Sequence, residues 1–313
     1  MTRRVALTLA LVLVSMTFPP ARAGQPDPCG QSARAARHAC ANDTRDAFWT
    51  ALGICTNTAD PAARTACRHA AKQETRDAAM GCSDQFDARG KLCDALGPAA
   101  YDPTIDPGRF VSPAAASVQP NTFFPLRPGT TWTYVGGGET TTVTVTDQTR
   151  QILGVTCIVV RDVVADAGGI VEDTEDFFAQ EVDGTVWYFG ELSQQLEGGD
   201  LTSIEGSWRA GVDGARPGRI MPAMPSAGET YRQEFAFGVA EDAAEVLSTT
   251  GSETVPAMSC TGTCVVTRDF TPLEPDAGEQ KFYAPGIGMI LEIEMETGIR
   301  SELVHFTGGD AMP

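Results

Sequence analysis

The sequence predicts an α+β chain in which an N-terminal antiparallel helical hairpin, stapled by disulfides, precedes an all-β antiparallel domain built as a duplicated β-meander. Three observations support this. Six cysteines between positions 29 and 93 are separated by 11, 15, 12, 15 and 11 residues. From residue 129 onward, runs of Thr, Val, Ile and aromatic residues alternate with Gly and Asp turns, which is typical of antiparallel strands. Several motifs of this second part recur in the same order about 100 residues later, so the sheet could curl into a barrel, a half-barrel or a sandwich.

The N-terminal residues 1–23 have the pattern of a secretory signal peptide. Arg3 and Arg4 precede an apolar run over 5–18, and an A-x-A cleavage site follows at 21–23. A run of about 14 residues is too short to span a bilayer comfortably, and no later segment comes closer. We therefore expect an exported chain, periplasmic or extracellular, with no membrane span and with disulfides as the default state of its cysteines.

The chain is strongly acidic. Its 313 residues contain 23 Lys and Arg against 41 Asp and Glu, a formal charge of −18, which becomes −21 if residues 1–23 are removed. Such a chain lacks the basic surface that phosphate backbones require, so nucleic acid is excluded as a partner. The chain has only three histidines, which leaves few candidates for His-dependent catalysis.

Residues 24–97 form the predicted hairpin. The segment is rich in Ala, Arg, Asp and Gln, which favours helix, and Asp60-Pro61 marks the start of a second helix. Facing residues of an antiparallel pair have a constant sum of positions, and the cysteine positions are symmetric about Pro61. Of the fifteen pairings that six cysteines allow, this symmetry selects one: Cys29–Cys93, Cys40–Cys82 and Cys55–Cys67.

Two roles are open for this hairpin. It could be a rigid spacer or cap, or it could be the element that recognises a protein partner. His38 and His69 are expected to be exposed helix residues and not metal ligands.

A proline-rich linker over 98–128 leads into the β domain at 129–313. Within that domain the segments 129–190 and 228–291 are predicted to be repeats. Residues 156–162 (TCIVVRD) match 263–269 (TCVVTRD), and Phe177-Phe178-Ala179 matches Phe282-Tyr283-Ala284.

The segment FPLRPGTTWTY at 124–134 resembles the opening strand of a group of uncharacterised exported bacterial β proteins, and DGTVWYFGE at 183–191 resembles a later hairpin of the same group. The resemblance covers about 121–306. The group has no assigned activity. Its curved sheet is similar to that of carriers of lipids and lipoproteins, which is an analogy of fold alone.

Two equivalent arginines are the candidate ligand-binding residues. Strand alternation places Arg161 on the face that carries Cys157 and Val159, and its repeat partner Arg268 on a similarly apolar face. An arginine on a buried apolar face is costly unless it is paired. Either each forms an internal ion pair with a neighbouring carboxylate, or the two bind the anionic head group of a ligand.

The remaining cysteines allow two arrangements. A local disulfide Cys260–Cys264 across a turn leaves Cys157 as a buried, inert thiol, whereas a Cys157–Cys264 bridge would join the repeats.

We identify no catalytic residue, no metal site and no cofactor. The acidic cluster at 172–176 is expected to be a solvated turn, with Ca²⁺ binding as the alternative. Met221 and Met224 are expected to fill the core and not to bind copper.

The sequence thus favours a non-enzymatic, exported binding protein with a hydrophobic or amphiphilic ligand in a β cup. One alternative is a structural or adhesion-type interaction module that uses the hairpin for recognition. Another is a carboxylate-based hydrolase. A cavity would favour the first, a filled core the second, and two facing carboxylates in a groove the third.

Overall fold

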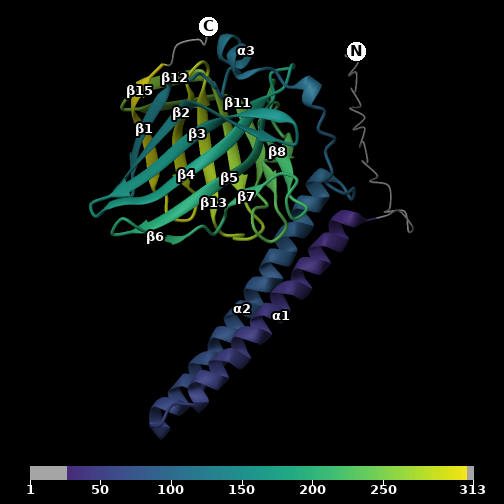
Figure 1. Cartoon of the computed structure of the whole chain (residues 1–313), viewed down its shortest axis with the longest axis vertical. Helices are drawn as coiled ribbons and strands as arrows, with labels where there is room; N and C mark the ends of the chain where they lie inside the picture. The colour runs from purple at the N-terminus through teal and green to yellow at the C-terminus, as the bar shows by residue number, and fades with distance from the viewer. Residues whose placement is uncertain (1–26, 309–313) are drawn as a thin grey trace, which may run out of the picture.

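The computed structural model of the chain describes residues 27–308, so the signal sequence expected at 1–23 lies outside the described residues. It shows a rounded β domain from which a long helical hairpin projects (Figure 1). Neither long helix within residues 27–308 has an apolar stretch that could cross a membrane.

The hairpin consists of α1 (Pro28–Thr56) and α2 (Pro61–Leu96), which run antiparallel side by side (Figure 1). Both helices begin with the same N-terminal capping motif. Asp27 accepts a hydrogen bond from the backbone N–H of Gly30, Asp60 accepts one from that of Ala63, and a proline occupies the first helical position each time. An aspartate cap followed by proline is a strong start signal because it satisfies a free N–H and presets φ.

The predicted disulfide pairing of the hairpin is confirmed. Cys29–Cys93, Cys40–Cys82 and Cys55–Cys67 are bonded, with Cα–Cα distances of 5.7, 5.7 and 5.5 Å. Apart from cysteines, the two helices bury only three alanines and two larger residues, Ala33, Ala36, Ala71, Arg89 and Leu92. The staples therefore carry much of the stability, at roughly 3–4 kcal/mol each in the chain-entropy model.

The proline-rich segment after the hairpin contains a 3-10 turn, η1 (Pro107–Arg109), and a short helix, α3 (Pro113–Val118). Around Phe110 it lies against the outside of the barrel wall, whereas its last part, from Phe124 to Leu126, lines the cavity inside the barrel. The Phe110 ring packs edge-on against the Phe189 ring, with ring centroids 5.4 Å apart, and the Val111 N–H donates to the Gln180 carbonyl. We call residues 98–128 the strap.

The β domain is an antiparallel, nearly closed barrel of 13 strands, in the order β10-β8-β5-β4-β3-β2-β1-β15-β14-β13-β12-β11-β9, with β6 and β7 attached to β5. The first and last strands of this order are separated in the chain only by Gln233, so the two sheet edges come together there. The strands are β1 (Thr131–Gly136), β2 (Glu139–Ile152), β3 (Val155–Asp166), β4 (Gly169–Gln180), β5 (Val186–Glu197), β6 (Asp200–Ser203), β7 (Trp208–Arg209), β8 (Arg216–Met221), β9 (Thr230–Arg232), β10 (Glu234–Phe235), β11 (Ala243–Val255), β12 (Met258–Phe270), β13 (Gly278–Ala284), β14 (Gly288–Glu294) and β15 (Arg300–Thr307).

The two halves of the barrel share strand order and register. β1 to β5 pair successively, and so do β9, β11, β12, β13 and β14. Val159 lies opposite Phe177 in the first half, and Val266 lies opposite Phe282 in the second. These common features support the internal duplication.

The turn that opens each half is also the same. The N–H of Gly129 donates to the carbonyl of Val145, and the N–H of Gly228 donates to that of Val246. The N···O distance is 2.8 Å in both hydrogen bonds. The two glycines have φ angles of 83° and 85°, a conformation that favours glycine because it has no Cβ.

The acidic cluster at 172–176 is the middle of β4, so the expectation of a solvated turn is wrong. Alternation divides the cluster between the two faces of the wall. Asp173 and Glu175 pair with arginines on the outer face, whereas Asp176 lines a cavity inside the barrel. The run of acids is thus separated onto two faces, and its members on the outer face, Asp173 and Glu175, have arginine partners.

Candidate functional site

The two arginines do not face the barrel interior, so that part of the ligand-site prediction is wrong. The Arg161 side chain is 51% exposed and its Nε lies 2.7 Å from Oδ1 of Asp173. The Arg268 side chain is 43% exposed and its Nη2 lies 2.9 Å from Oε2 of Glu245. Both form outward, half-exposed ion pairs across neighbouring strands.

The error has a simple physical cause. In β3 the residues from Cys157 to Val160 are all buried, on both faces of the strand. Outside the barrel the strap packs against the hydrophobic core through Ile105 and Phe110. An apolar face is therefore not a sign of the interior in this protein.

The residue after each arginine does line the interior. Asp162 of β3 and Asp269 of β12 both border a cavity of about 230 Å³ inside the barrel. Asp176 of β4 and Lys281 of β13 line the same cavity. The site thus draws its charged groups from matching strands of the two halves.

In the second half of the barrel three carboxylates share one cation, Lys281. Nζ of Lys281 lies 2.8 Å from Glu279, 3.3 Å from Glu292 and 3.5 Å from Asp269. Burial alone would lower the pKa of Lys281, but these carboxylates hold it well above its usual value. Lys281 in turn lowers the pKa of Glu279.

Asp269 has further partners. Its two carboxylate oxygens accept hydrogen bonds from the Thr267 hydroxyl at 2.6 Å and from the Gln233 amide at 2.9 Å. The carboxylate on this side of the cavity is therefore fully engaged, and it offers little to a ligand.

The acids of the first half have no such ion-pair partner in the described part of the chain, although the charge of Lys281 lowers the pKa of Asp162 against the larger effect of burial. Asp162 and Asp176 form no ion pair with any of residues 27–308, and the buried Oδ1 of Asp162 has no hydrogen-bond partner there. Asp176 accepts one hydrogen bond, from the Tyr188 hydroxyl at 2.6 Å. Two neighbouring carboxylates of this kind create a negative potential in the cavity.

This environment raises the pKa of several acids into the neutral range. Burial, with a further contribution from the charge of Asp176, raises the pKa of Asp162 to about 8. Burial raises the pKa of Asp176 to about 7 against the opposing hydrogen bond from Tyr188, and that of nearby Glu191 also to about 7. The barrel interior therefore holds protons near neutral pH.

The rest of the cavity wall is aromatic and apolar. The Trp132 indole N–H donates to the Ile287 carbonyl at 2.8 Å, and the Tyr134 hydroxyl donates to the Met289 carbonyl at 2.9 Å. Phe178 packs edge-on against Phe124, with ring centroids 5.0 Å apart. These contacts fix the rings and give the acidic pair a rigid apolar surround.

The other candidate residues are distributed over the molecule. Cys260 and Cys264 form a disulfide, as the first arrangement predicted, and Cys157 is a buried free thiol whose pKa is raised by burial. Met221 is completely buried, whereas Met224 is 86% exposed. No group of three or more metal-ligating side chains occurs within the part of the chain that the structure describes.

Sequence reasoning missed the inward acids although they stood next to the selected arginines. The Arg-Asp dipeptide occurs at the same place in both repeats, and one residue of each dipeptide must face inward. That pattern identified the pair of positions, but it did not indicate which member lay inside.

Comparisons of the chain with protein-family models, curated proteins and solved structures gave no match.

Proposed function

We propose that the protein is an exported, non-enzymatic binding protein whose barrel holds a small amphiphilic amine. The observation that carries the proposal is the unpartnered carboxylate oxygen of Asp162, which borders a cavity with aromatic walls. The ligand expected here is a cation, whereas the prediction based on Arg161 and Arg268 was a ligand with an anionic head group.

The electrostatics favour a cationic head group. A buried carboxylate without a partner is costly, and it either takes up a proton or binds a cation. An ammonium group beside Asp162 and Asp176 would make charge-assisted hydrogen bonds and would favour their ionised forms. Lys281 cannot take this role fully because it is already paired with three other carboxylates.

The size of the cavity limits the ligand. An apolar cavity of about 150 Å³ accommodates benzene, while drug-sized ligands need roughly 300–1,000 Å³. The volume here, about 230 Å³, fits one aromatic ring or a short aliphatic body with an amino group. A long-chain lipid does not fit, so the fold-level analogy with lipid carriers is not part of the proposal.

Calorimetric titration with 2-phenylethylamine and its neutral analogue 2-phenylethanol tests the proposal. The amine should bind and the alcohol should bind at least about tenfold more weakly, the equivalent of one charge-assisted hydrogen bond. Asp162→Asn should abolish this preference, whereas Asp173→Asn, which removes a carboxylate from the outer face of the wall, should not. Equal affinity for amine and alcohol would contradict the proposal.

The disulfides support export. Four disulfides occur among the described residues, and such bonds persist mainly in oxidising compartments. Cell fractionation with an antibody against the native chain should find the protein outside the cytoplasm, without residues 1–23.

The same acidic pair favours a second candidate, a carboxylate-based hydrolase. Asp162 and Asp176 border one cavity, and their raised pKa values suit a general acid. Turnover of small nitrophenyl glycosides or esters that is lost in Asp162→Asn and in Asp176→Asn would favour this candidate. A bound amine that is recovered unchanged would favour the first.

A further inference from the structure

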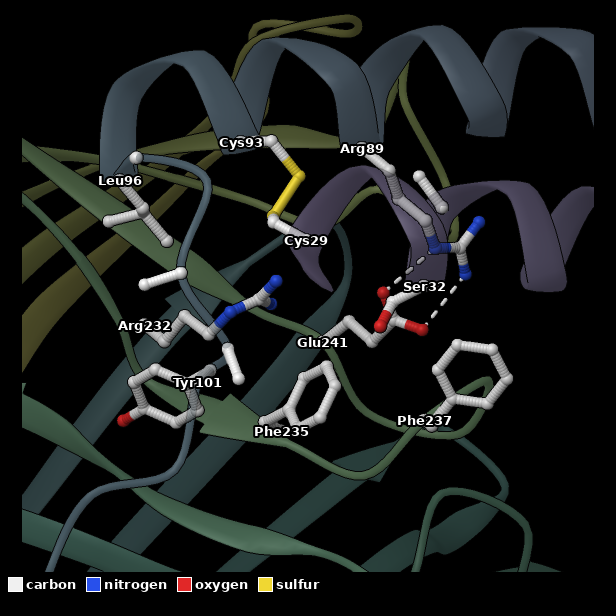
Figure 2. A pocket seen from close by; sticks show the side chains of 14 residues that line it. Cys29, Ser32, Arg89, Cys93, Leu96, Tyr101, Arg232, Phe235, Phe237 and Glu241 are labelled. Atoms are coloured by element: carbon white, nitrogen blue, oxygen red, sulfur yellow. Dashed lines mark hydrogen bonds and ion pairs between the residues drawn. A yellow bond between two sulfur atoms is a disulfide. The ribbon is translucent and has the colours of Figure 1, made fainter. Parts of the chain in front are cut away.

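A second pocket, separate from the barrel cavity, lies where the base of the hairpin meets the barrel. It has a volume of about 210 Å³. Figure 2 shows that the hairpin contributes Leu96 and the Cys29–Cys93 disulfide, the strap contributes Tyr101, and the barrel contributes Arg232 and Phe235. The pocket therefore exists only because three separate parts of the chain come together.

One ion pair joins the hairpin to the barrel at this pocket. Nε and Nη2 of Arg89, in α2, each lie 2.9 Å from an oxygen of Glu241, whose side chain is 2% exposed. The N–H of Gly238 donates to the same carboxylate at 2.8 Å. Glu241 is thus engaged by three donors, and it makes no hydrogen bond to the second arginine of the pocket (Figure 2).

That second arginine is Arg232. It is only 7% exposed, and its Nε and Nη1 have no hydrogen-bond partner within residues 27–308. Its guanidinium carbon lies 4.7 Å from the ring centroid of Phe235 and 5.6 Å from that of Tyr101. The two rings stabilise the cation partly, but neither supplies a negative charge.

The pocket therefore carries an excess positive charge. Arg89 and Glu241 compensate each other, and Arg232 has no carboxylate of its own in the described part of the chain. Burial lowers the pKa of Arg232, as expected for a cation in a poorly hydrated place, while the nearby Glu241 opposes that effect. A buried cation of this kind is costly unless an anion compensates it.

We propose that this pocket binds a small organic monocarboxylate with an apolar body, and that Arg232 provides the positive charge that recognises it. A guanidinium group is well suited to a planar carboxylate. Apart from Ser32, the remaining lining, which includes Ala33, Leu96, Ala99 and Phe237, is apolar and suits a hydrocarbon body better than inorganic phosphate. The volume fits one ring, since about 150 Å³ is enough for benzene.

Calorimetric titration of the full mature chain tests the proposal. The probes are acetate, benzoate and phenylacetate, the neutral amide of each acid, and inorganic phosphate. Benzoate or phenylacetate should bind more tightly than its amide. In Arg232→Met the affinity for that acid should fall by about 10–100-fold, the range expected for loss of a charged hydrogen bond. Arg232→Lys should retain part of it.

Two control variants distinguish this pocket from the other charged sites of the protein. Arg161→Met removes an arginine of the outer wall and should leave carboxylate binding unchanged. Asp162→Asn, which removes the inner acid of the barrel cavity, should also leave it unchanged. Conversely, Arg232→Met should not affect the binding of 2-phenylethylamine, so that the failure of one proposal can be distinguished from the failure of the other.

Stability gives an independent readout. If the pocket is built for an anion, Arg232→Met should raise the melting temperature of the ligand-free protein, because it removes an uncompensated buried charge. The proposal is overturned if no carboxylate binds, if acids and amides bind equally, if phosphate binds in preference to the aromatic acids, or if Arg161→Met weakens binding as much as Arg232→Met.

Discussion

Asp176 and Lys281 occupy equivalent places in the two halves of the barrel and carry opposite charges. Each directly precedes the phenylalanine that lies opposite the matching valine of the neighbouring strand, Phe177 in β4 and Phe282 in β13. Both line the inner cavity. In the half that contains Lys281 three carboxylates share one cation, whereas Asp162 and Asp176 of the other half form no ion pair within residues 27–308.

This asymmetry makes stability depend on pH. The pKa is raised to about 8 for Asp162 and to about 7 for Asp176 and Glu191, against roughly 4 for these groups in the unfolded chain. The folded state therefore binds more protons, and its stability should fall as the pH rises from about 4 to about 8. The lowered pKa of Glu279 and the raised pKa of Lys281 act outside this window.

Urea unfolding at pH 5 and at pH 8 measures the effect. We expect the free energy of unfolding to be at least about 2 kcal/mol lower at pH 8, since each unit of pKa shift corresponds to about 1.4 kcal/mol. Asp162→Asn should raise stability at pH 8 and flatten the dependence, and Asp173→Asn should leave the slope as it is. Stability that rises between pH 5 and pH 8 would contradict the assignment.

Removal of Lys281, the cation that lines the inner cavity, should lower stability, whereas Asp162→Asn should raise it. Lys281→Met leaves Glu279, Glu292 and Asp269 without their common partner. Because Lys281 is 21% exposed, the expected loss lies between about 1 kcal/mol, as for a surface pair, and the about 3–5 kcal/mol of a fully buried one. The loss should be greatest at pH 8 and smaller at pH 5, where the carboxylates can be protonated. Lys91→Met, at an exposed site of α2, should change the free energy of unfolding by less than about 0.5 kcal/mol.

The attachment of the hairpin should depend on the pair Arg89–Glu241. Arg89→Met leaves a carboxylate that is almost fully buried, with an expected loss of about 3–5 kcal/mol. Arg161→Met breaks a half-exposed pair and should cost less than about 1 kcal/mol. Thermal or denaturant unfolding of the two variants, compared under one condition, checks this difference, and equal losses would argue against a buried anchor.

The disulfides of the hairpin should stabilise mainly the helices α1 and α2, and the barrel much less. The double variant Cys40→Ser with Cys82→Ser removes a disulfide that spans 42 residues of sequence, with an expected loss of about 4 kcal/mol in the chain-entropy model. Hydrogen exchange should rise in α1 and α2 and remain unchanged in the barrel strands. Increased exchange throughout the barrel would show that the two parts unfold together.

The sequence alone determined the hairpin in detail. Its Asp60-Pro61 helix start and the cysteine positions symmetric about Pro61 are local or periodic signals, and an antiparallel helical pair converts them directly into contacts. The antiparallel strands and the shared motifs of the two halves were readable for the same reason, because turns and alternation are local properties of the chain.

Only the tertiary structure decided which face of each strand is the inside. Alternation separates Arg161 from Asp162, but it cannot say which of the two faces the interior when the strap buries apolar residues on the outer wall as well. The Arg232 pocket was beyond prediction for a related reason. Its key pair, Arg89 and Glu241, is separated by 152 residues, and such contacts depend on how the hairpin, strap and barrel pack together.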